Sequence, residues 1–221
     1  MLSFFGNFID LMAQALELLN GVVHNYGLAI ILFTLIIKFA LLPLTIKQTK
    51  SMKAMQDIQP EMQKIQDKYD DDKEKQQEEM MKLYQENDVN PAAGCLPMIL
   101  QLVILIPLYR AILSLQGVMG DATFLWIGRL TDGSLAQPDP ALVIINGLAM
   151  VGQTYITQQI NGSGGQGNKM MWIMPIFIVF IGFQLPSGLL LYWLTSTIFT
   201  GVQQFLISGV SDDSGAKEAA E

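Results

Sequence analysis

Long apolar blocks separated by polar segments dominate the pattern of this chain. The first block runs from Leu28 to Ile46, and as a helix it would be about 28 Å long, close to the roughly 30 Å hydrocarbon thickness of a bilayer. Four further apolar blocks lie at residues 94–115, 141–160, 171–185 and 189–207. We therefore predict an all-α polytopic membrane protein with five transmembrane helices.

Residues 1–27 have the periodicity of an amphipathic helix. Apolar side chains such as Ile9, Met12 and Leu16 recur at helical spacing, while Asp10 and Glu17 lie on the opposite face. The segment has no Lys or Arg, whereas a secretory signal peptide needs a positively charged region. We therefore predict that it is not a cleaved signal. We predict an N-terminal helix that lies in the membrane interface; a short additional span is the alternative.

Residues 47–93 form a polar segment with eight Lys and eleven Asp or Glu. Its apolar residues recur at helical spacing, which predicts a helical hairpin outside the bilayer. Pro60 fits the first turn of a new helix, and Asp70 to Asp72 fit the turn that follows, where an Asp can cap the next helix. A solvated charged loop without a binding role is the alternative.

Methionines give the hairpin a soft apolar surface, which adapts to varied partners. We predict that this surface contacts hydrophobic segments of a partner protein. The residues are Met52, Met55, Met62, Met80 and Met81.

The other connections follow from the order of the blocks. Residues 116–140 are predicted as an extracytoplasmic loop, 161–170 as a cytoplasmic loop and 208–221 as a disordered cytoplasmic tail. Pro186 to Gly188 fit a tight turn that would join the last two spans into a hairpin.

The basic residues predict the orientation, because cytoplasmic loops of membrane proteins carry an excess of Lys and Arg. The eight Lys of residues 47–93, together with Lys169 and Lys217, place ten basic residues on one side. The N-terminus is therefore predicted outside and the C-terminus in the cytoplasm.

Composition narrows the function. The chain is 51% hydrophobic and 15% charged, with a net charge of −7, which argues against a nucleic-acid-binding surface. It has one histidine and one cysteine, so we expect no metal site and no cofactor. No sequence motif of a common hydrolase or nucleotide-binding enzyme is present, and we predict that the chain is not an enzyme.

Lys38 lies near the middle of the first apolar block. A Lys at mid-depth costs about 2.5–3.5 kcal/mol on insertion scales, and none of the five blocks contains an Asp or Glu that could pair with it. Lys38 is therefore either neutral in a packed bundle or charged in a water-filled cavity, and we favour the cavity. Thr34 lies one turn away on the same face, and Gln101, Gln153, Gln158 and Gln159 could supply polar groups from other spans.

Several strings resemble one known family. IIKFALLPLTIKQTK at residues 36–50, NPAAGCLPMILQ at 90–101 and LPSGLLLYW at 185–193 are similar in sequence and order to the YidC-type membrane protein insertases. The resemblance covers about residues 20–207.

This resemblance implies a fold and a function. It implies five spans around a hydrophilic groove that is open to the cytoplasm and to lipid, in the bacterial plasma (inner) membrane. It implies an insertase and chaperone for nascent membrane proteins, alone or with the Sec translocon, and with the ribosome as a further partner. Lys38 matches a groove position that is usually Arg, and other groove positions are also matched. The predicted groove residues are those that match the family, Lys38, Thr34, Gln158, Tyr192 and Trp193, together with Gln101.

A solute transporter or anion channel that uses Lys38 is the alternative function. Transporters often contain inverted repeats with interrupted helices, and the first span has no visible repeat elsewhere in the chain.

Overall fold

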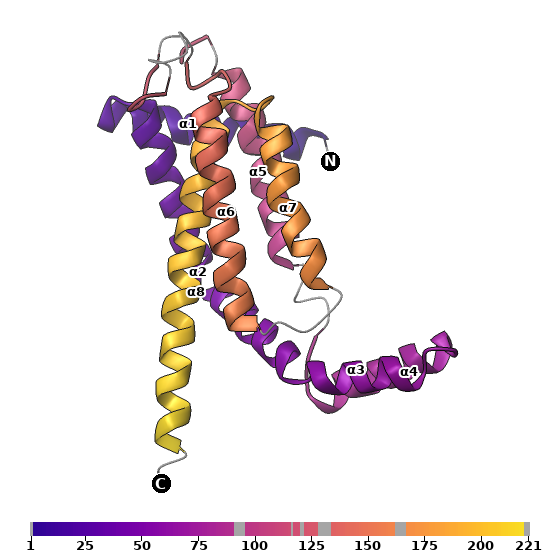
Figure 1. Cartoon of the computed structure of the whole chain (residues 1–221). Helices are drawn as coiled ribbons and strands as arrows, with labels where there is room; N and C mark the ends of the chain where they lie inside the picture. Colours follow the sequence, from indigo (N-terminus) through magenta and orange to yellow (C-terminus); the bar gives the residue numbers. More distant parts are fainter. Residues whose placement is uncertain are drawn as a thin grey trace.

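The computed structural model describes residues 2–90, 96–115, 117–119, 122–127, 134–161 and 167–218, and every regular element in these ranges is an α-helix (Figure 1). The helices are α1 Leu2–Val23, α2 Tyr26–Asp57, α3 Gln59–Lys68, α4 Lys73–Glu86, α5 Leu96–Ser114, α6 Pro140–Asn161, α7 Gly167–Gly182 and α8 Ser187–Glu218. The all-α prediction is confirmed. Residues 162–166 of the predicted cytoplasmic loop lie outside the described ranges.

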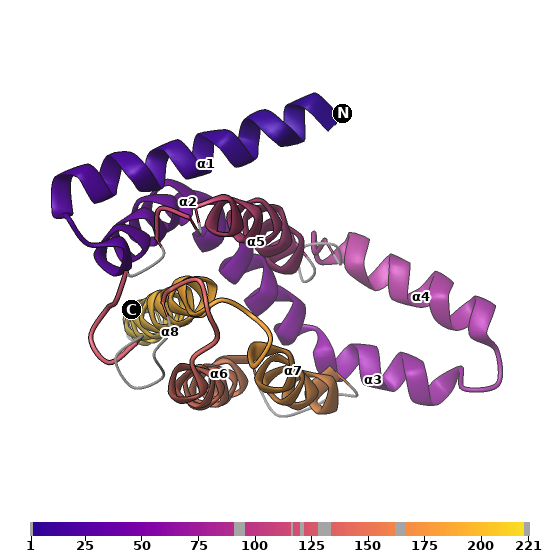
Figure 2. The ribbon, with the colours of Figure 1, turned by 90° about the horizontal axis from the view of Figure 1, so that it is seen from above.

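Five helices form a bundle, α2, α5, α6, α7 and α8, which Figure 2 shows from one end. α8 packs against α2, α5 and α6, and α7 packs against α6. The expected tight hairpin of the last two spans is not what the structure shows, because α6 rather than α8 is the main neighbour of α7. The turn between them is short, but α7 and α8 diverge from it.

Within the described residues, two helical stretches of the bundle are long and apolar enough to cross a membrane, Tyr26–Asp57 and Pro140–Gln158. The apolar stretch Ile99–Ser114 is shorter. The five predicted apolar blocks correspond to the five bundle helices, although residues 94–95 lie outside the described ranges and residues 183–185 follow the end of α7. α8 differs from the prediction at its end, because it continues as helix to Glu218, through most of the predicted disordered tail.

α1 lies across one end of the bundle and packs against α2 and α5 (Figures 1 and 2). Met12 and Leu16 are buried there, on the apolar face that the sequence predicts. Leu11 and Leu18 are exposed on the outer side, so α1 has apolar surface left over after it has packed on the bundle.

α2 extends well beyond the predicted span and carries the chain into the hairpin of α3 and α4. The side chain of Asn25 caps its start by accepting from the Leu28 amide at 3.0 Å. Pro60 lies in the first turn of α3, and Asp72 caps α4 by accepting from the Lys75 amide at 3.1 Å. These are the positions that the sequence predicts for both residues.

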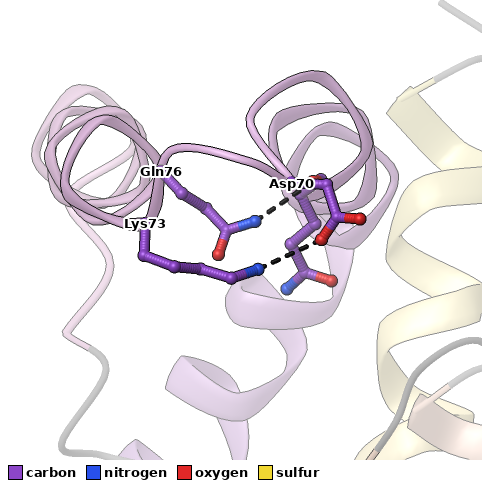
Figure 3. Close-up of polar contacts among 4 residues, drawn as sticks. Asp70, Lys73 and Gln76 are labelled. Carbon is purple, nitrogen blue, oxygen red and sulfur yellow. Dashed lines mark hydrogen bonds and ion pairs between the residues drawn. The ribbon is translucent and has the colours of Figure 1, made fainter.

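Side-chain contacts at the tip and along the middle join the two hairpin helices. At the tip, Lys73 pairs with Asp70 at 3.1 Å, and the side-chain amide of Gln76 donates to the backbone carbonyl of Gln66 at 3.1 Å (Figure 3). Such exposed pairs contribute little stability. A small apolar cluster contributes more, and its buried members are Ile58, Leu83 and Val89.

Candidate functional site: a polar cavity around Lys38

The bundle has a tightly packed half next to α1. Among the described side chains, its buried members within the bundle come from α2, α5, α6 and α8, and all belong to one apolar cluster. Members that are less than 2% exposed include Ile30, Leu108, Ile112, Leu142 and Leu190. We call this region the packed half.

The loop between α5 and α6 covers the end of the packed half. Gly188, at the start of α8, donates its backbone N–H to the Leu135 carbonyl at 2.8 Å. A Cβ at Gly188 would lie 3.2 Å from both that oxygen and Cδ1 of Ile30, so the close approach favours glycine. The loop, α2 and α8 are therefore in close contact at Gly188.

The other half of the bundle contains a cavity of about 390 Å³, which we call the Lys38 cavity. Its wall is formed by the second half of α2, the first half of α5, the middle of α8 and one residue of α6. The lining residues are Lys38, Leu41, Thr45, Gln48, Thr49, Met52, Leu100, Gln101, Leu102, Ile104, Leu105, Gln153, Trp193, Ser196, Thr197, Thr200, Gln203 and Gln204. Of these lining residues, Lys38 alone carries a formal charge.

The Lys38 ammonium has a defined position in the cavity. Its Nζ donates to Oγ1 of Thr200 on α8 at 3.1 Å. Oγ1 of Thr200 in turn donates to the Ser196 carbonyl, one turn earlier, at 2.8 Å. A Lys ammonium has three N–H donors and no acceptor, and within the described part of the chain no Asp or Glu forms an ion pair with Lys38.

Further hydrogen bonds tie α8 to its neighbours around the cavity. Nε2 of Gln203 donates to Oγ1 of Thr45 on α2 at 2.8 Å, and Nε2 of Gln101 on α5 donates to the Tyr192 hydroxyl at 3.3 Å. The Thr157 hydroxyl on α6 donates to the side chain of Gln204 at 2.9 Å. α8 is thus the element on which the polar groups of three other helices converge.

The structure brings some of the predicted groove residues together at the cavity. Lys38, Gln101 and Trp193 line it, as does Gln153. Tyr192 is buried behind the wall and reaches it through Gln101.

Thr34 and Gln158 lie elsewhere. Thr34 is 0% exposed, and its hydroxyl donates to the Ile30 carbonyl of its own helix at 2.7 Å. Gln158 is half-buried on α6, beyond the lining residues, and its Nε2 has no hydrogen-bond partner among the described residues. A contact of either residue with a bound protein stays a prediction.

The hairpin methionines divide into three groups. Met52 lines the Lys38 cavity. Met55 and Met62 pack into the hairpin's own apolar cluster, where the Tyr84 hydroxyl approaches the Met62 sulfur at 4.0 Å. Met80 is half-buried, and Met81 is 52% exposed.

Sequence reasoning missed the polar stripe of α8. Its members recur at helical spacing inside an apolar block, which is the available signal. A single hydroxyl within a span is only weakly polar, so each of the three Ser and Thr residues alone passes unnoticed, and the two Gln residues lie near the end of the block. The missed residues are Ser196, Thr197, Thr200, Gln203 and Gln204.

Comparison with known proteins identifies the family. The sequence profile of the family described as 60Kd inner membrane protein matches residues 18–214. The chain belongs to this family. The resemblance to YidC-type insertases is thereby confirmed, since relatives with that name match over most of their length.

Three of these relatives are bacterial. "Membrane protein insertase YidC" of Fusobacterium nucleatum is 41% identical over 201 residues, which cover 89% of this chain and 92% of the relative. "Membrane protein insertase YidC 2" of Bacillus anthracis is 45% identical, with 84% and 72% covered. "Membrane protein insertase MisCA" of Bacillus subtilis is 42% identical, with 84% and 71% covered.

A solved structure shares the fold. It is the crystal structure of an active YidC insertase with the first transmembrane domain resolved, and it matches with a TM-score of 0.69 at 32% sequence identity. The match covers 90% of this chain and 45% of that one, so this chain spans less than half of the solved protein.

Proposed function

We propose that this chain is a membrane protein insertase, which receives nascent membrane proteins at the Lys38 cavity and releases their hydrophobic segments into the bilayer. The names of the relatives support the insertase function. The observation that carries the mechanism is a lone cationic side chain in a cavity whose lining combines Gln, Ser and Thr with Leu, Ile, Met and Trp. Nothing in the comparisons favours the alternative, a solute transporter or channel.

In this proposal α2, α5, α6, α7 and α8 are the five spans. The N-terminus is outside, α1 lies in the outer interface, and the α3–α4 hairpin and the C-terminus are in the cytoplasm. The ten basic residues on the hairpin side support this orientation. The exposed Leu11, Leu18 and Val22 of α1 fit an interfacial helix.

With that orientation the Lys38 cavity is the proposed cytoplasm-open groove. Its lining extends along α2 from Lys38 to Met52, toward the hairpin, while the packed half lies on the outer side. A substrate segment would therefore enter from the cytoplasm and stop against the packed half.

Lys38 supplies the electrostatic part of the mechanism. An acidic or polar segment of a substrate must leave water on its way across, and a cation in a partly hydrated site lowers that cost because charges interact more strongly where the dielectric constant is low. The polar walls keep the ammonium itself solvated. No covalent step is required.

The driving force comes from the apolar span of the substrate. Leu102 lines the cavity and is 44% exposed, and Ile99, Val103 and Ile106 of the same helix are also exposed. A hydrophobic segment that slides along this side of α5 reaches lipid, where burial is worth about 25 cal/mol per Å².

The hairpin would make the first contact with hydrophobic nascent segments, and the exposed Met81 is the described methionine best placed for it. The Sec translocon and the ribosome are further proposed partners. The family resemblance supports these partnerships, and pull-down of the full chain from detergent extracts tests them.

Complementation of an insertase-depleted bacterial strain tests the charge mechanism. We expect Lys38→Arg to restore growth, and Lys38→Ala and Lys38→Glu to fail while the protein accumulates normally. The direct readout is insertion of a single-span substrate with an acidic N-terminal tail, scored by protease protection of that tail.

The matched control is Thr195→Val on α8. Thr195 is half-buried, its hydroxyl donates to the Leu191 carbonyl at 2.8 Å, and it lies outside the cavity lining. Normal rescue and normal insertion of the acidic-tailed substrate by Lys38→Ala would contradict the proposed mechanism.

A further inference from the structure

Thr200 accepts a hydrogen bond from the Lys38 ammonium across the cavity, and its own proton is already committed. The Oγ1–H of Thr200 points to the Ser196 carbonyl at 2.8 Å, the common back-bond of a Thr inside a helix. Only lone pairs are left on Oγ1 to face Nζ of Lys38 at 3.1 Å. The Thr200 oxygen is therefore a fixed acceptor, which suits an ammonium group.

Lys side chains are long and flexible, and a free one samples many rotamers. A fixed acceptor on α8 selects those rotamers that hold the ammonium of α2 against the opposite wall. One of its three N–H donors is used by Thr200, and the other two have no protein acceptor among the described residues.

We propose that Thr200 is a positioning residue, which orders the Lys38 ammonium so that its remaining donors face an acidic substrate segment. This inference rests on the proposed function. Preorganisation lowers the entropy lost when the substrate carboxylate arrives, so the effect is specific to acidic substrates.

The position of Thr200 also separates this role from helix packing. Thr45 and Gln203 form a second hydrogen bond between α2 and α8, at 2.8 Å, and it does not involve Lys38. A packing role would be shared by both bonds, whereas ordering of the ammonium belongs to Thr200 alone.

The experiment uses the full chain in proteoliposomes and two substrates that differ only in the tail, one with Asp residues and one with Asn at the same positions. The measured quantity is the ratio of the acidic to the neutral insertion rate. We expect Thr200→Val, which is nearly isosteric, to lower this ratio about threefold to tenfold, as loss of one hydrogen bond would. Thr200→Ser keeps the acceptor oxygen and is expected to keep the ratio of the unaltered chain.

Two controls test the assignment. Thr45→Val removes the other α2–α8 bond and is expected to change both rates together, with the ratio kept. In the Lys38→Ala background, Thr200→Val is expected to have no further effect on the ratio, because a residue that acts through Lys38 has nothing left to position.

An unchanged or increased ratio in Thr200→Val, with normal amounts of folded protein, would overturn the inference while leaving the proposed function intact. The same holds if Thr45→Val lowers the ratio as much as Thr200→Val does. Failure of the unaltered chain to insert either substrate would contradict the proposed function itself, and the inference with it.

Discussion

The packed half and the Lys38 cavity are built from the same helices. α5 contributes Leu108 and Ile112 to the packed half and Gln101 to the cavity. α8 contributes Leu190 to the first and Thr200 to the second. The character of the bundle therefore changes along the helix axes and not from one helix to the next.

This difference follows from where polar residues are placed on each helix. In the packed half, apolar side chains interdigitate at the density of a protein interior. On the cavity side, Thr and Gln side chains bond to one another across helices, and these small or flexible side chains leave space that apolar side chains fill elsewhere. The packed half closes one end, and the cavity remains open to an occupant.

A charge introduced into the packed half is expected to have the largest effect of the substitutions that compare the two halves. Leu108→Lys puts an unpaired ammonium among fully buried apolar side chains. We expect it to prevent accumulation of folded protein, since a Lys at mid-depth costs about 2.5–3.5 kcal/mol on insertion scales. A Lys two turns earlier on the same helix, in Gln101→Lys, places the charge in the cavity and should leave accumulation close to normal. Immunoblotting of membrane fractions measures both.

Equal accumulation of the Leu108→Lys and Gln101→Lys proteins would mean that the two halves do not differ in packing, and the distinction between them would fail.

Truncation in the two halves should have unequal effects on stability. Leu108 is 0% exposed and Leu102 is 44% exposed on the same helix. Leu108→Ala is expected to reduce the free energy of unfolding by about 2–5 kcal/mol, and Leu102→Ala by less than about 1 kcal/mol. Thermal unfolding in detergent compares the two, and a larger loss for Leu102→Ala would contradict the account.

Thr34 tests where the boundary between the two halves lies. Its hydroxyl bonds within α2 in the packed half, so Thr34→Val should leave the ratio of acidic to neutral insertion unchanged and lower stability by less than about 1.5 kcal/mol. A drop in that ratio would place Thr34 at the substrate, as its match to the family's groove positions suggests.

The hairpin provides the smallest effect, outside both halves. The backbone N–H of Lys75 bonds to the Asp72 side chain and lowers the pKa of that carboxyl below its ordinary value. A lowered pKa in the folded state stabilises α4 at pH values above the ordinary Asp pKa, and this contribution is lost as the pH falls through the lowered value.

We therefore expect the protection factors of the amides in the first turn of α4, which compare the observed with the intrinsic exchange rate at each pH, to fall in acid. The fall should be smaller in Asp72→Asn, which keeps the cap but does not titrate. Hydrogen exchange of the full chain measures this. The same acid response in both proteins would show that Asp72 is not the titrating group.

The sequence predicted the helices well because each signal is local. Long apolar blocks, the cap at Asp72 and the proline at the start of α3 depend only on neighbours in the chain. The sequence also identified Lys38, since a charge without a carboxylate partner in any apolar block is visible without a structure.

The composition of the site was predicted less well, because it depends on how far along each helix the close packing extends, which a helical face alone does not show. Thr34 and Lys38 are one turn apart, yet one is buried in the packed half and the other lines the cavity. The end of α8 was also misjudged, since the small and acidic residues after Ile207 gave no sign of a helix that continues to Glu218.

Reversing the charge in the cavity and in the substrate tail tests the central claim most directly. The measurement is the insertion rate in proteoliposomes of two substrates, one with an acidic and one with a basic tail, by the unaltered chain and by Lys38→Glu. The account predicts that the unaltered chain prefers the acidic tail and that Lys38→Glu reverses the preference. Retention of the acidic preference by a well-folded Lys38→Glu protein would contradict it.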